Sequence, residues 1–219
     1  MKPRLLPLGD SALLVQFGDE IDPAINRRVH ALDALLQTDK PAGVIETVPA
    51  YATLLVYYDP LILTFAQAAD WVNAKMDKVL SAASRKPRQI EVPVQYGGEH
   101  GPDLDFVAAY HQLSVQEVIR IHASRVYLVY MMGFTPGFAY MGKLDELIAT
   151  PRLDTPRTRV TAGSVGIAGA QTGVYPIDSP GGWRLIGRTG LPLFAPEADQ
   201  PFLFSPGDTV QFMIEALDA

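Results

Sequence analysis

The sequence predicts an α+β protein with a small N-terminal α+β domain over residues 1–88 and a larger, mostly β domain over residues 89–219. In the first part, strand-like and helix-like segments follow one another in a way typical of helices packed on one face of an antiparallel sheet. From residue 126 onward, many short strand-like runs with Gly and Pro turns predict a β-barrel or a sandwich. A chain of 219 residues is long enough to bury a sizeable core.

The first elements have clear boundaries in the sequence. Residues 4–18 predict two short strands around a Gly-Asp turn, because apolar and polar residues alternate there. A helix follows, with Asp22 as its N-cap and Pro23 at its first position. Residues at helical spacing form its predicted buried face, namely Ile25, Val29, Leu32, Leu35 and Leu36.

Two more strands are expected between residues 43 and 58. A second helix begins at Thr64, where Gln67 completes a capping box. Its predicted buried face consists of Phe65, Ala69, Val72, Met76 and Val79. A strand over 88–96 ends this series of elements, none of which carries a chemical motif.

Residues 96–103 contain three Gly and one Pro and are the best candidate for a linker. Two short helices are expected after it, one from Asp103 to His111 and one from Ser114, where Glu117 closes a capping box. We do not interpret this pair as a DNA-binding helix-turn-helix, because the protein is acidic and the turn lacks the usual glycine.

A buried strand over 126–132 leads directly into a glycine-rich stretch from Gly133 to Gly190. After it, residues 191–216 contain two further strand-like runs separated by a turn at 206–208. Eleven of the 18 Gly residues lie between Gly133 and Gly190. Glycine at this density lets the backbone turn sharply or approach a ligand closely, so we interpret the stretch as a binding or reaction surface.

Composition excludes several classes of partner. The formal net charge of −6 argues against nucleic acid or an anionic membrane as the main partner. No apolar run approaches the length of a membrane span, and the N-terminus lacks the pattern of a signal peptide, so we expect a cytoplasmic protein. The absence of Cys excludes a disulfide framework and thiolate chemistry.

Common reaction centres are also missing. Ser164 lies in AGSVG, which nearly matches a nucleophile elbow, but that fold needs a histidine after the serine and none follows it. A different order that uses His111 or His122 stays formally open. The chain has neither a P-loop nor a dinucleotide fingerprint, and without a Cys or His cluster we expect no metal site.

The glycine-rich stretch is locally basic. It holds six basic and four acidic residues, a local charge of +2 in an acidic chain. Five of the six are Arg, whose planar fork binds carboxylate or phosphate at two points. Hydroxyls, glycine-turn N–H groups and aromatic rings accompany them. This set predicts a pocket for a small, flat, anionic or amide-bearing ligand, with donors that stabilise negative charge on a carbonyl or phosphoryl oxygen.

Three long blocks, GFTPGFAYMG, TPRLDTPRTRVTAGSVGIAGAQTGVYP and SPGGWRLIGRTGLPLF, closely resemble the signature of the family of 5-oxoprolinase B subunits. This family is also called KipI-like, or allophanate hydrolase subunit 1. The resemblance extends over the whole chain and is densest from about residue 92 to residue 212. Ala139, Met141 and Gly190 depart from the residues that the family pattern leads us to expect.

The resemblance implies a fold and an activity. We expect a ferredoxin-like α+β domain followed by a cyclophilin-like β-barrel. Such proteins pair with the C subunit of 5-oxoprolinase, as a heterodimer or a dimer of heterodimers, and act with its A subunit. Together they open 5-oxo-L-proline to L-glutamate with ATP, and Mg is expected with the nucleotide. The ATP contacts would be shared with the partner subunits, which would explain why this chain lacks a P-loop.

In that interpretation Arg152, Arg157 or Arg188 holds a carboxylate or phosphate, while Ser164, Gln171 and glycine-turn N–H groups face the reacting carbonyl. The expected catalytic residues are Arg157, Ser164, Gln171 and Arg188. The expected substrate-binding residues are Phe134, Gly137, Phe138, Tyr140, Arg152, Gly166, Tyr175, Ser179, Gly182 and Trp183.

Two other functions stay open at this level. The KipI name implies a protein that docks on a sporulation-like histidine kinase and blocks its phosphotransfer, with Phe134, Phe138 and Trp183 as the contact surface. The other function is that of a subunit for the hydrolysis of allophanate or another urea-derived amide.

Overall fold

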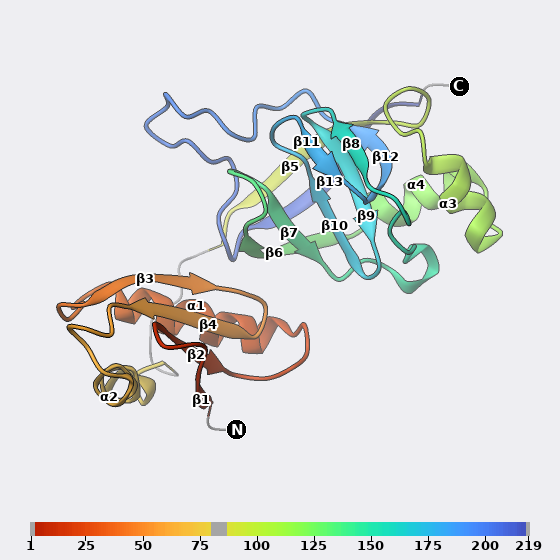
Figure 1. Cartoon of the computed structure of the whole chain (residues 1–219). Helices are drawn as coiled ribbons and strands as arrows, with labels where there is room; N and C mark the ends of the chain where they lie inside the picture. Colours follow the sequence, from red (N-terminus) through yellow and green to blue (C-terminus); the bar gives the residue numbers. More distant parts are fainter. Residues whose placement is uncertain (1–2, 80–86, 218–219) are drawn as a thin grey trace. The chain divides into compact units, whose positions relative to one another are not determined.

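A computed structural model describes residues 3–79 and 87–217 of the chain (Figure 1). The chain divides into two compact units, Met1–Lys86 and Pro87–Ala219. No helix among the described residues is long and apolar enough to cross a membrane. The described residues also contain no cluster of three His, Cys, Asp or Glu side chains that could hold a metal ion.

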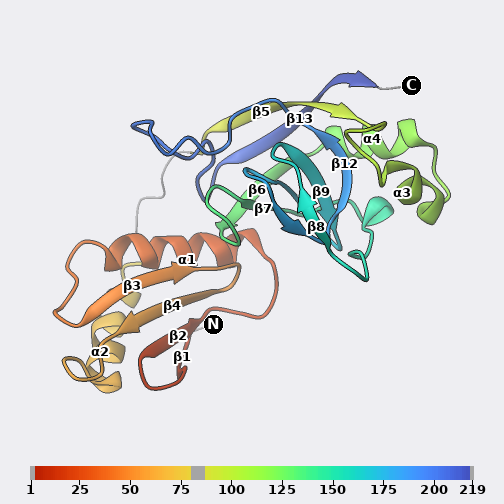
Figure 2. The ribbon, with the colours of Figure 1, turned by 45° about the horizontal axis from the view of Figure 1, so that its top comes forward.

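The first unit consists of one antiparallel sheet and two helices (Figure 2). The strands have the order β1-β2-β4-β3 in the sheet, and neighbouring strands run antiparallel. In chain order the elements are β1 (Arg4–Pro7), β2 (Ala12–Gln16), α1 (Pro23–Leu36), β3 (Val44–Pro49), β4 (Thr53–Tyr58) and α2 (Phe65–Met76).

Both helices begin as the sequence predicts. The side chain of Asp22 accepts hydrogen bonds from the backbone N–H groups of Ala24 and Ile25, and Pro23 occupies the first turn. Thr64 and Gln67 form both halves of a capping box at the start of α2. These side chains satisfy N–H groups that have no partner within the helix.

The two helices cover the same face of the sheet. Leu13 lies opposite Val56 in the β2–β4 register, and both side chains are buried in one apolar cluster. That cluster also contains Val29, Leu32 and Leu36 of α1 and Ala68 and Val72 of α2. The predicted buried face of the second helix is confirmed, because Val72 and Val79 are buried and Phe65, Ala69 and Met76 pack against the cluster. The prediction missed Ala68, which is fully buried.

The chain order of the elements in this unit differs from that of a ferredoxin-like domain, so the ferredoxin-like assignment stays a prediction. A ferredoxin-like domain has the chain order βαββαβ. Here the order is ββαββα, because the edge strand β1 precedes β2 instead of following α2. The strand after α2, β5 (Gln89–Tyr96), belongs to the barrel of the second unit, although it follows directly on the elements of the first unit in the chain.

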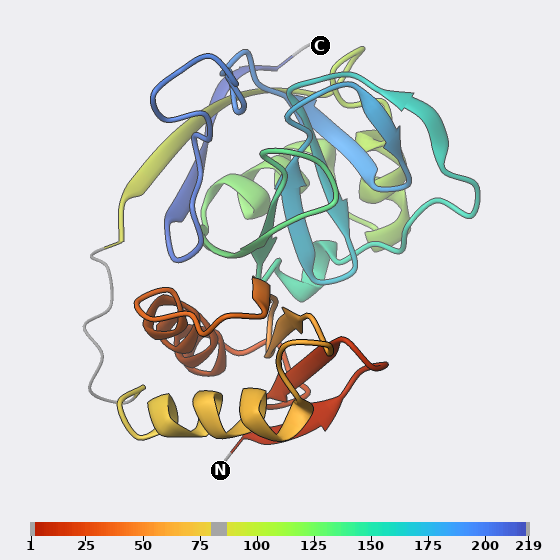
Figure 3. The same ribbon diagram turned by 60° about the vertical axis from the view of Figure 1, so that its left-hand side comes forward.

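The second unit is a closed barrel, which decides between the predicted barrel and sandwich. Seven strands follow one another around it in the order β10-β7-β6-β13-β5-β12-β9. Figure 3 shows β5, in yellow, running beside β13, in dark blue, and these two strands pair in parallel. The other barrel strands are β6 (Val126–Met132), β7 (Ala139–Gly142), β9 (Ser164–Ala168), β10 (Gln171–Val174), β12 (Arg184–Arg188) and β13 (Thr209–Leu217).

Smaller elements flank the barrel. The strands β8 (Arg157–Val160) and β11 (Ser179–Gly181) form a separate two-stranded sheet. Two helices, α3 (Leu104–His111) and α4 (Val115–Ala123), and a short 3₁₀ turn, η1 (Glu146–Ile148), complete the unit. The predicted capping box of Ser114 and Glu117 is present at the start of α4.

Residues 96–103 are not a linker between domains, because they lie inside the second unit. The N–H of Gly97 donates to the carbonyl of Ile186 at 3.2 Å, and the N–H of Asp103 donates to that of Leu185 at 2.9 Å. A Cβ atom on Gly101 would lie 2.2 Å from the carbonyl oxygen of Ile186. The glycines of this segment therefore permit close packing against β12, and they do not mark a flexible connection.

The chain after the glycine-rich stretch also differs from the prediction. The run at 209–217 is strand β13, but residues 191–204 form only one isolated bridge, between Phe194 and Phe202. This segment contains Pro192, Pro196 and Pro201, and each proline removes a backbone donor that a strand would need.

Candidate functional site

Three glycines of the stretch from Gly133 to Gly190 lie directly against aromatic side chains. A Cβ on Gly166 of β9 would lie 3.1 Å from the Cβ of Trp183, and one on Gly173 of β10 would lie 3.2 Å from the Phe138 ring. A Cβ on Gly181 of β11 would lie 2.5 Å from the Tyr175 hydroxyl. These glycines let aromatic rings lie directly against the backbone of β9 and β10 in the barrel and of β11 in the small sheet.

The rings form a cluster outside the main barrel core. Phe138 lies at its centre and makes edge-to-face contacts with Tyr140, Tyr175 and Trp183, at ring-centroid distances of 4.9, 5.2 and 5.5 Å. Phe134 contacts Phe138 at 5.5 Å but is 60% exposed. Perpendicular rings at these separations pack favourably and restrict one another.

This aromatic cluster forms the wall of a pocket of about 340 Å³. Arg152 lies at the pocket with its guanidinium carbon 5.9 Å from the Trp183 ring centroid, and it is the one charged residue among the described residues that line the space. The lining residues are Phe134, Phe138, Tyr140, Arg152, Leu153, Pro156, Tyr175, Pro180, Gly181, Gly182 and Trp183.

Burial keeps the two tyrosine hydroxyls of the pocket neutral. Desolvation raises the pKa of Tyr140 above its ordinary value, and the nearby Arg152 opposes this shift. Desolvation also raises the pKa of Tyr175, against the effects of a backbone hydrogen bond from Trp183 and of Arg152. Both phenols are therefore hydrogen-bond donors at neutral pH.

Seven of the ten residues expected to bind substrate line this pocket, namely Phe134, Phe138, Tyr140, Arg152, Tyr175, Gly182 and Trp183. Gly166 lies beneath it, against Trp183 and Tyr175. Ser179 is buried in β11 next to the lining residue Pro180, and no hydrogen-bond partner for its Oγ is found among the described residues. Gly137 instead lines a neighbouring cavity.

The expected catalytic residues lie apart from the pocket lining. Arg157 donates from Nη2 to Oδ1 of Asp103 at 2.8 Å, and Arg188 donates from Nε to the carbonyl of Ala162 at 3.1 Å. Ser164 is buried at the start of β9, and Gln171 is half-buried at the start of β10. Their catalytic roles stay predictions.

The other arginines of the stretch also have structural partners. Arg159 forms an exposed ion pair with Asp178 at 2.6 Å. The guanidinium of Arg184 lies 3.8 Å from the ring centroid of Phe106 and donates to the carbonyl of Pro151. The arginines of the stretch therefore lie in several separate contacts. Among the described residues that line the pocket, Arg152 supplies the positive charge.

The two histidines left open as partners of Ser164 are used elsewhere. His122 is fully buried between the Tyr96 hydroxyl, 2.8 Å from Nδ1, and the Thr172 hydroxyl, 2.9 Å from Nε2. His111 lies 3.1 Å from Oγ1 of Thr150. Among the described hydrogen bonds neither ring reaches Ser164, so no serine–histidine pair is formed.

Several residues of the site were not predicted. Leu153, Pro156, Pro180 and Gly181 line the pocket, and they are sequence neighbours of predicted residues within the same signature blocks. Asp103, which holds Arg157, lies 54 positions earlier in the chain. Only the position of Asp103 at the start of a helix marks it in the sequence.

The arrangement suits a small, flat molecule with one negative charge. The aromatic walls exclude water and give apolar contact, Arg152 offers a cation, and two neutral phenols offer hydrogen-bond donors.

Comparison with known proteins places this chain in a family. The model of the family described as "Carboxyltransferase domain, subdomain C and D" matches residues 3–204. The chain is 44% identical over 216 residues to the B subunit of 5-oxoprolinase from Bacillus subtilis, an alignment that covers 94% of this chain and 90% of that protein. It is also 24% identical to urea amidolyase of Saccharomyces cerevisiae, of which it spans only 13%.

Two crystal structures show the same fold. A conserved uncharacterized protein from Pyrococcus horikoshii is 50% identical, with a TM-score of 0.58 over 97% of this chain and 98% of that one. TTHA0988 is 36% identical with a TM-score of 0.80 over 93% of this chain, which spans 39% of the length of that protein. Because the family match covers most of the sequence and a relative of similar length is 44% identical, the chain belongs to the family of 5-oxoprolinase B subunits.

Proposed function

We propose that this chain is the B subunit of an ATP-dependent 5-oxoprolinase, which converts 5-oxo-L-proline to L-glutamate together with the A and C subunits. The observation that carries the proposal is the 44% identity, over nearly the whole of both chains, to a protein named as the B subunit of 5-oxoprolinase. The more distant likeness to urea amidolyase does not favour a urea-derived substrate. We expect the complex to work in the cytoplasm.

The pocket supports this substrate. 5-Oxoproline is a flat five-membered lactam that carries one carboxylate. The rings of Phe138 and Trp183 would hold the lactam, and Arg152 would pair with its carboxylate. The hydroxyls of Tyr140 and Tyr175 are protonated at neutral pH, so they would donate to the lactam oxygen as negative charge develops there.

The residues of this pocket do not fit a magnesium-bound triphosphate. Its lining contains one cation and, among the described residues, no carboxylate to hold the metal. A triphosphate carries several negative charges and normally needs a cradle of N–H groups with a lysine or several arginines. ATP and its Mg would therefore be held largely by the partner subunits, and we assign no step through the nucleotide to residues of this chain.

The test is reconstitution of the complex. The chain would be co-expressed with the A and C subunits and supplied with ATP and 5-oxoproline, urea or allophanate in parallel, while glutamate and ADP are measured. Glutamate formation that depends on this chain supports the proposal. Turnover of urea or allophanate without turnover of 5-oxoproline would sink it, and so would capture of a histidine kinase without any turnover.

A further inference from the structure

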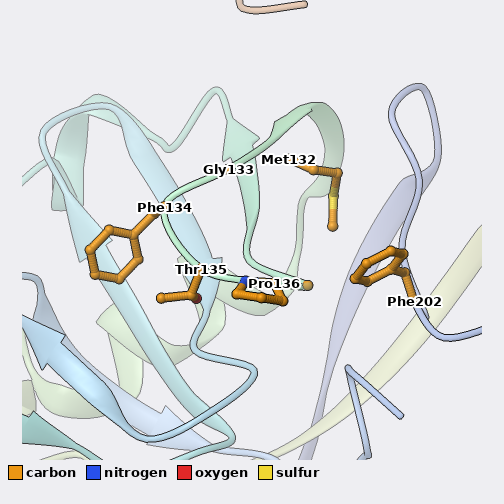
Figure 4. Close-up of a pocket in the computed structure, with 7 residues that line it drawn as sticks. Met132, Gly133, Phe134, Thr135, Pro136 and Phe202 are labelled. Carbon is orange, nitrogen blue, oxygen red and sulfur yellow. The ribbon is translucent and has the colours of Figure 1, made fainter. Parts of the chain in front are cut away.

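The aromatic pocket has one exposed wall and one buried wall. Phe134 is 60% exposed, and Figure 4 shows its ring on the side of its loop that faces away from Phe202. Trp183 is only 5% exposed, and its ring contacts the rings of Phe138 and Tyr140 at centroid distances of 5.5 and 5.9 Å. The position of the Trp183 ring therefore sets the shape of the buried half of the pocket.

The backbone next to Trp183 is held by Asp103, which lies outside the pocket lining. Oδ2 of Asp103 accepts the N–H of Leu185 at 2.7 Å, and the N–H of Asp103 donates to the Leu185 carbonyl at 2.9 Å. Leu185 follows Trp183 by two positions and belongs to the same buried cluster. Asp103 thus binds both backbone polar groups of Leu185 and fixes the point at which the chain enters β12.

Arg157 connects the same carboxylate to Trp183 itself. Nη2 of Arg157 lies 2.8 Å from Oδ1 of Asp103, and Nη1 donates to the Trp183 carbonyl at 3.4 Å. The guanidinium can make both contacts at once, because its N–H groups have a fixed planar arrangement. Asp103 and Arg157 together therefore hold the chain at Trp183 and at Leu185.

A second buried carboxylate offers a comparison within the same unit. Asp208 is fully buried, pairs with Arg88 at 2.6 Å and accepts the backbone N–H of Ser205 at 2.9 Å. Asp103 and Asp208 are thus two buried carboxylates, each bound by an arginine and by a backbone N–H. The residues around Asp208 are not among the described residues that line the aromatic pocket, whereas the Asp103–Arg157 pair contacts the backbone of a lining residue.

We propose that Asp103 and Arg157 are positioning residues for the substrate, which act through Trp183 and do not line the pocket themselves. Without this pair the chain at Trp183 would shift, and the ring would move relative to its aromatic neighbours. The guanidinium carbon of Arg152 lies 5.9 Å from the Trp183 ring centroid, so this cation would be displaced with the ring. The effect on substrate rests on the proposed function, whereas the effect on Trp183 does not.

Fluorescence of Trp183 tests the proposal without any substrate. The chain contains two Trp residues, so Trp71→Phe leaves Trp183 as the remaining one. In this background Asp103→Asn should shift the Trp183 emission to longer wavelength and increase its quenching by acrylamide. Asparagine keeps an acceptor for the Leu185 N–H but loses the charge that attracts Arg157.

Asp208→Asn is the matched control for a purely structural effect. It should lower the midpoint of urea denaturation, because it also weakens a buried ion pair, but the emission and quenching of Trp183 should not change. Unchanged Trp183 fluorescence in Asp103→Asn, or an equal change in Asp208→Asn, overturns the proposal.

Kinetics of the reconstituted complex give the second measurement. Asp103→Asn should raise the KM for 5-oxoproline by about tenfold and change kcat less, because the pair shapes the wall that binds the substrate. Asp208→Asn should leave the KM unchanged. If the wild-type complex forms no glutamate, the proposed function fails, while the fluorescence of Trp183 still decides the positioning role.

Arg157→Lys keeps the test decisive if Asp103→Asn does not fold. Lysine retains a positive charge beside Asp103 but lacks the second N–H branch that reaches the Trp183 carbonyl. We expect smaller increases in acrylamide quenching and in KM than in Asp103→Asn. Wild-type values of both quantities in Arg157→Lys would show that the pair serves only the fold, and they would overturn the role of Arg157.

Discussion

Asp103, at the start of α3, holds Arg157, at the start of β8, through a hydrogen-bonded ion pair of 2.8 Å between Oδ1 and Nη2. The second carboxylate oxygen of Asp103 accepts the backbone N–H of Leu185 at 2.7 Å. Arg157 also donates to the carbonyl of Trp183 at 3.4 Å. One carboxylate thus joins α3, β8 and β12 behind the aromatic pocket.

This relationship predicts a structural role for Arg157. Arg157→Ala should lower the free energy of unfolding by about 2 kcal/mol or more, because it leaves the nearly buried Asp103 carboxylate without its charged partner. Urea denaturation measures the change. Arg159→Ala is the matched control, since its ion pair with Asp178 is exposed and should contribute little to stability. If Arg157→Ala kept full stability and abolished turnover, Arg157 would be catalytic instead.

Arg152 is predicted to bind the carboxylate of the substrate. Arg152→Gln should raise the KM for 5-oxoproline by about tenfold to a hundredfold, which corresponds to the loss of one charge-assisted hydrogen bond. Arg152→Lys should recover part of the affinity, because it keeps the charge but loses the planar fork. The assay is glutamate formation by the reconstituted complex. An unchanged KM in Arg152→Gln would remove this residue from the site.

Gly181 is predicted to be essential for the position of Tyr175. In Gly181→Ala the new methyl group would lie 2.5 Å from the Tyr175 hydroxyl, so the ring or the strand must shift. We expect a loss of about 1–3 kcal/mol in unfolding free energy, together with weaker substrate binding. Gly190→Ala is the control, because nothing lies within 4 Å of its Cβ position. Equal stability of the two variants would contradict the close packing described above.

The backbone of Phe134 is predicted to be strained. Its φ of +68° lies in the left-handed region, which glycine tolerates and other residues adopt at a cost. Phe134→Gly should therefore be more stable than Phe134→Ala by about 1 kcal/mol, as thermal or urea unfolding would show. Both variants should bind substrate less well, since the ring lines the pocket. Greater stability of the alanine variant would argue that the loop is unstrained.

His122 predicts a pH dependence of stability. Full burial lowers its pKa from 6.5 to about 3, so the folded protein keeps this ring neutral while the unfolded chain binds a proton below pH 6.5. The unfolded state then holds more protons, and stability should fall as the pH drops from about 6.5 toward 3, by up to about 1.4 kcal/mol per pH unit. Unfolding free energies measured across this range should have a smaller slope in His122→Gln. An identical slope in the variant would assign the acid sensitivity to other groups.

Local signals in the sequence determined most of the elements. Asp22, Thr64 and Ser114 cap their helices as predicted, because a cap depends on residues only two or three positions away. The strands of residues 4–58 and the turn-rich barrel region also follow from local alternation and from Gly and Pro. Element order alone did not reveal that β5 pairs with β13, more than a hundred residues later, because that pairing is a long-range contact.

The sequence also predicted seven of the eleven residues that line the aromatic pocket, since they lie in the blocks that resemble one family. The tertiary structure decided which arginine lines the pocket. Arg152, Arg157 and Arg188 are equivalent by composition, yet Arg157 is held by Asp103 and Arg188 by the carbonyl of Ala162. The direction in which a side chain points depends on strand pairing and register, and these are set by partners far away in the chain. For that reason the sequence showed the charge of the stretch and three candidate arginines, whereas only the fold showed that Arg152 is the one of the three that lines the pocket.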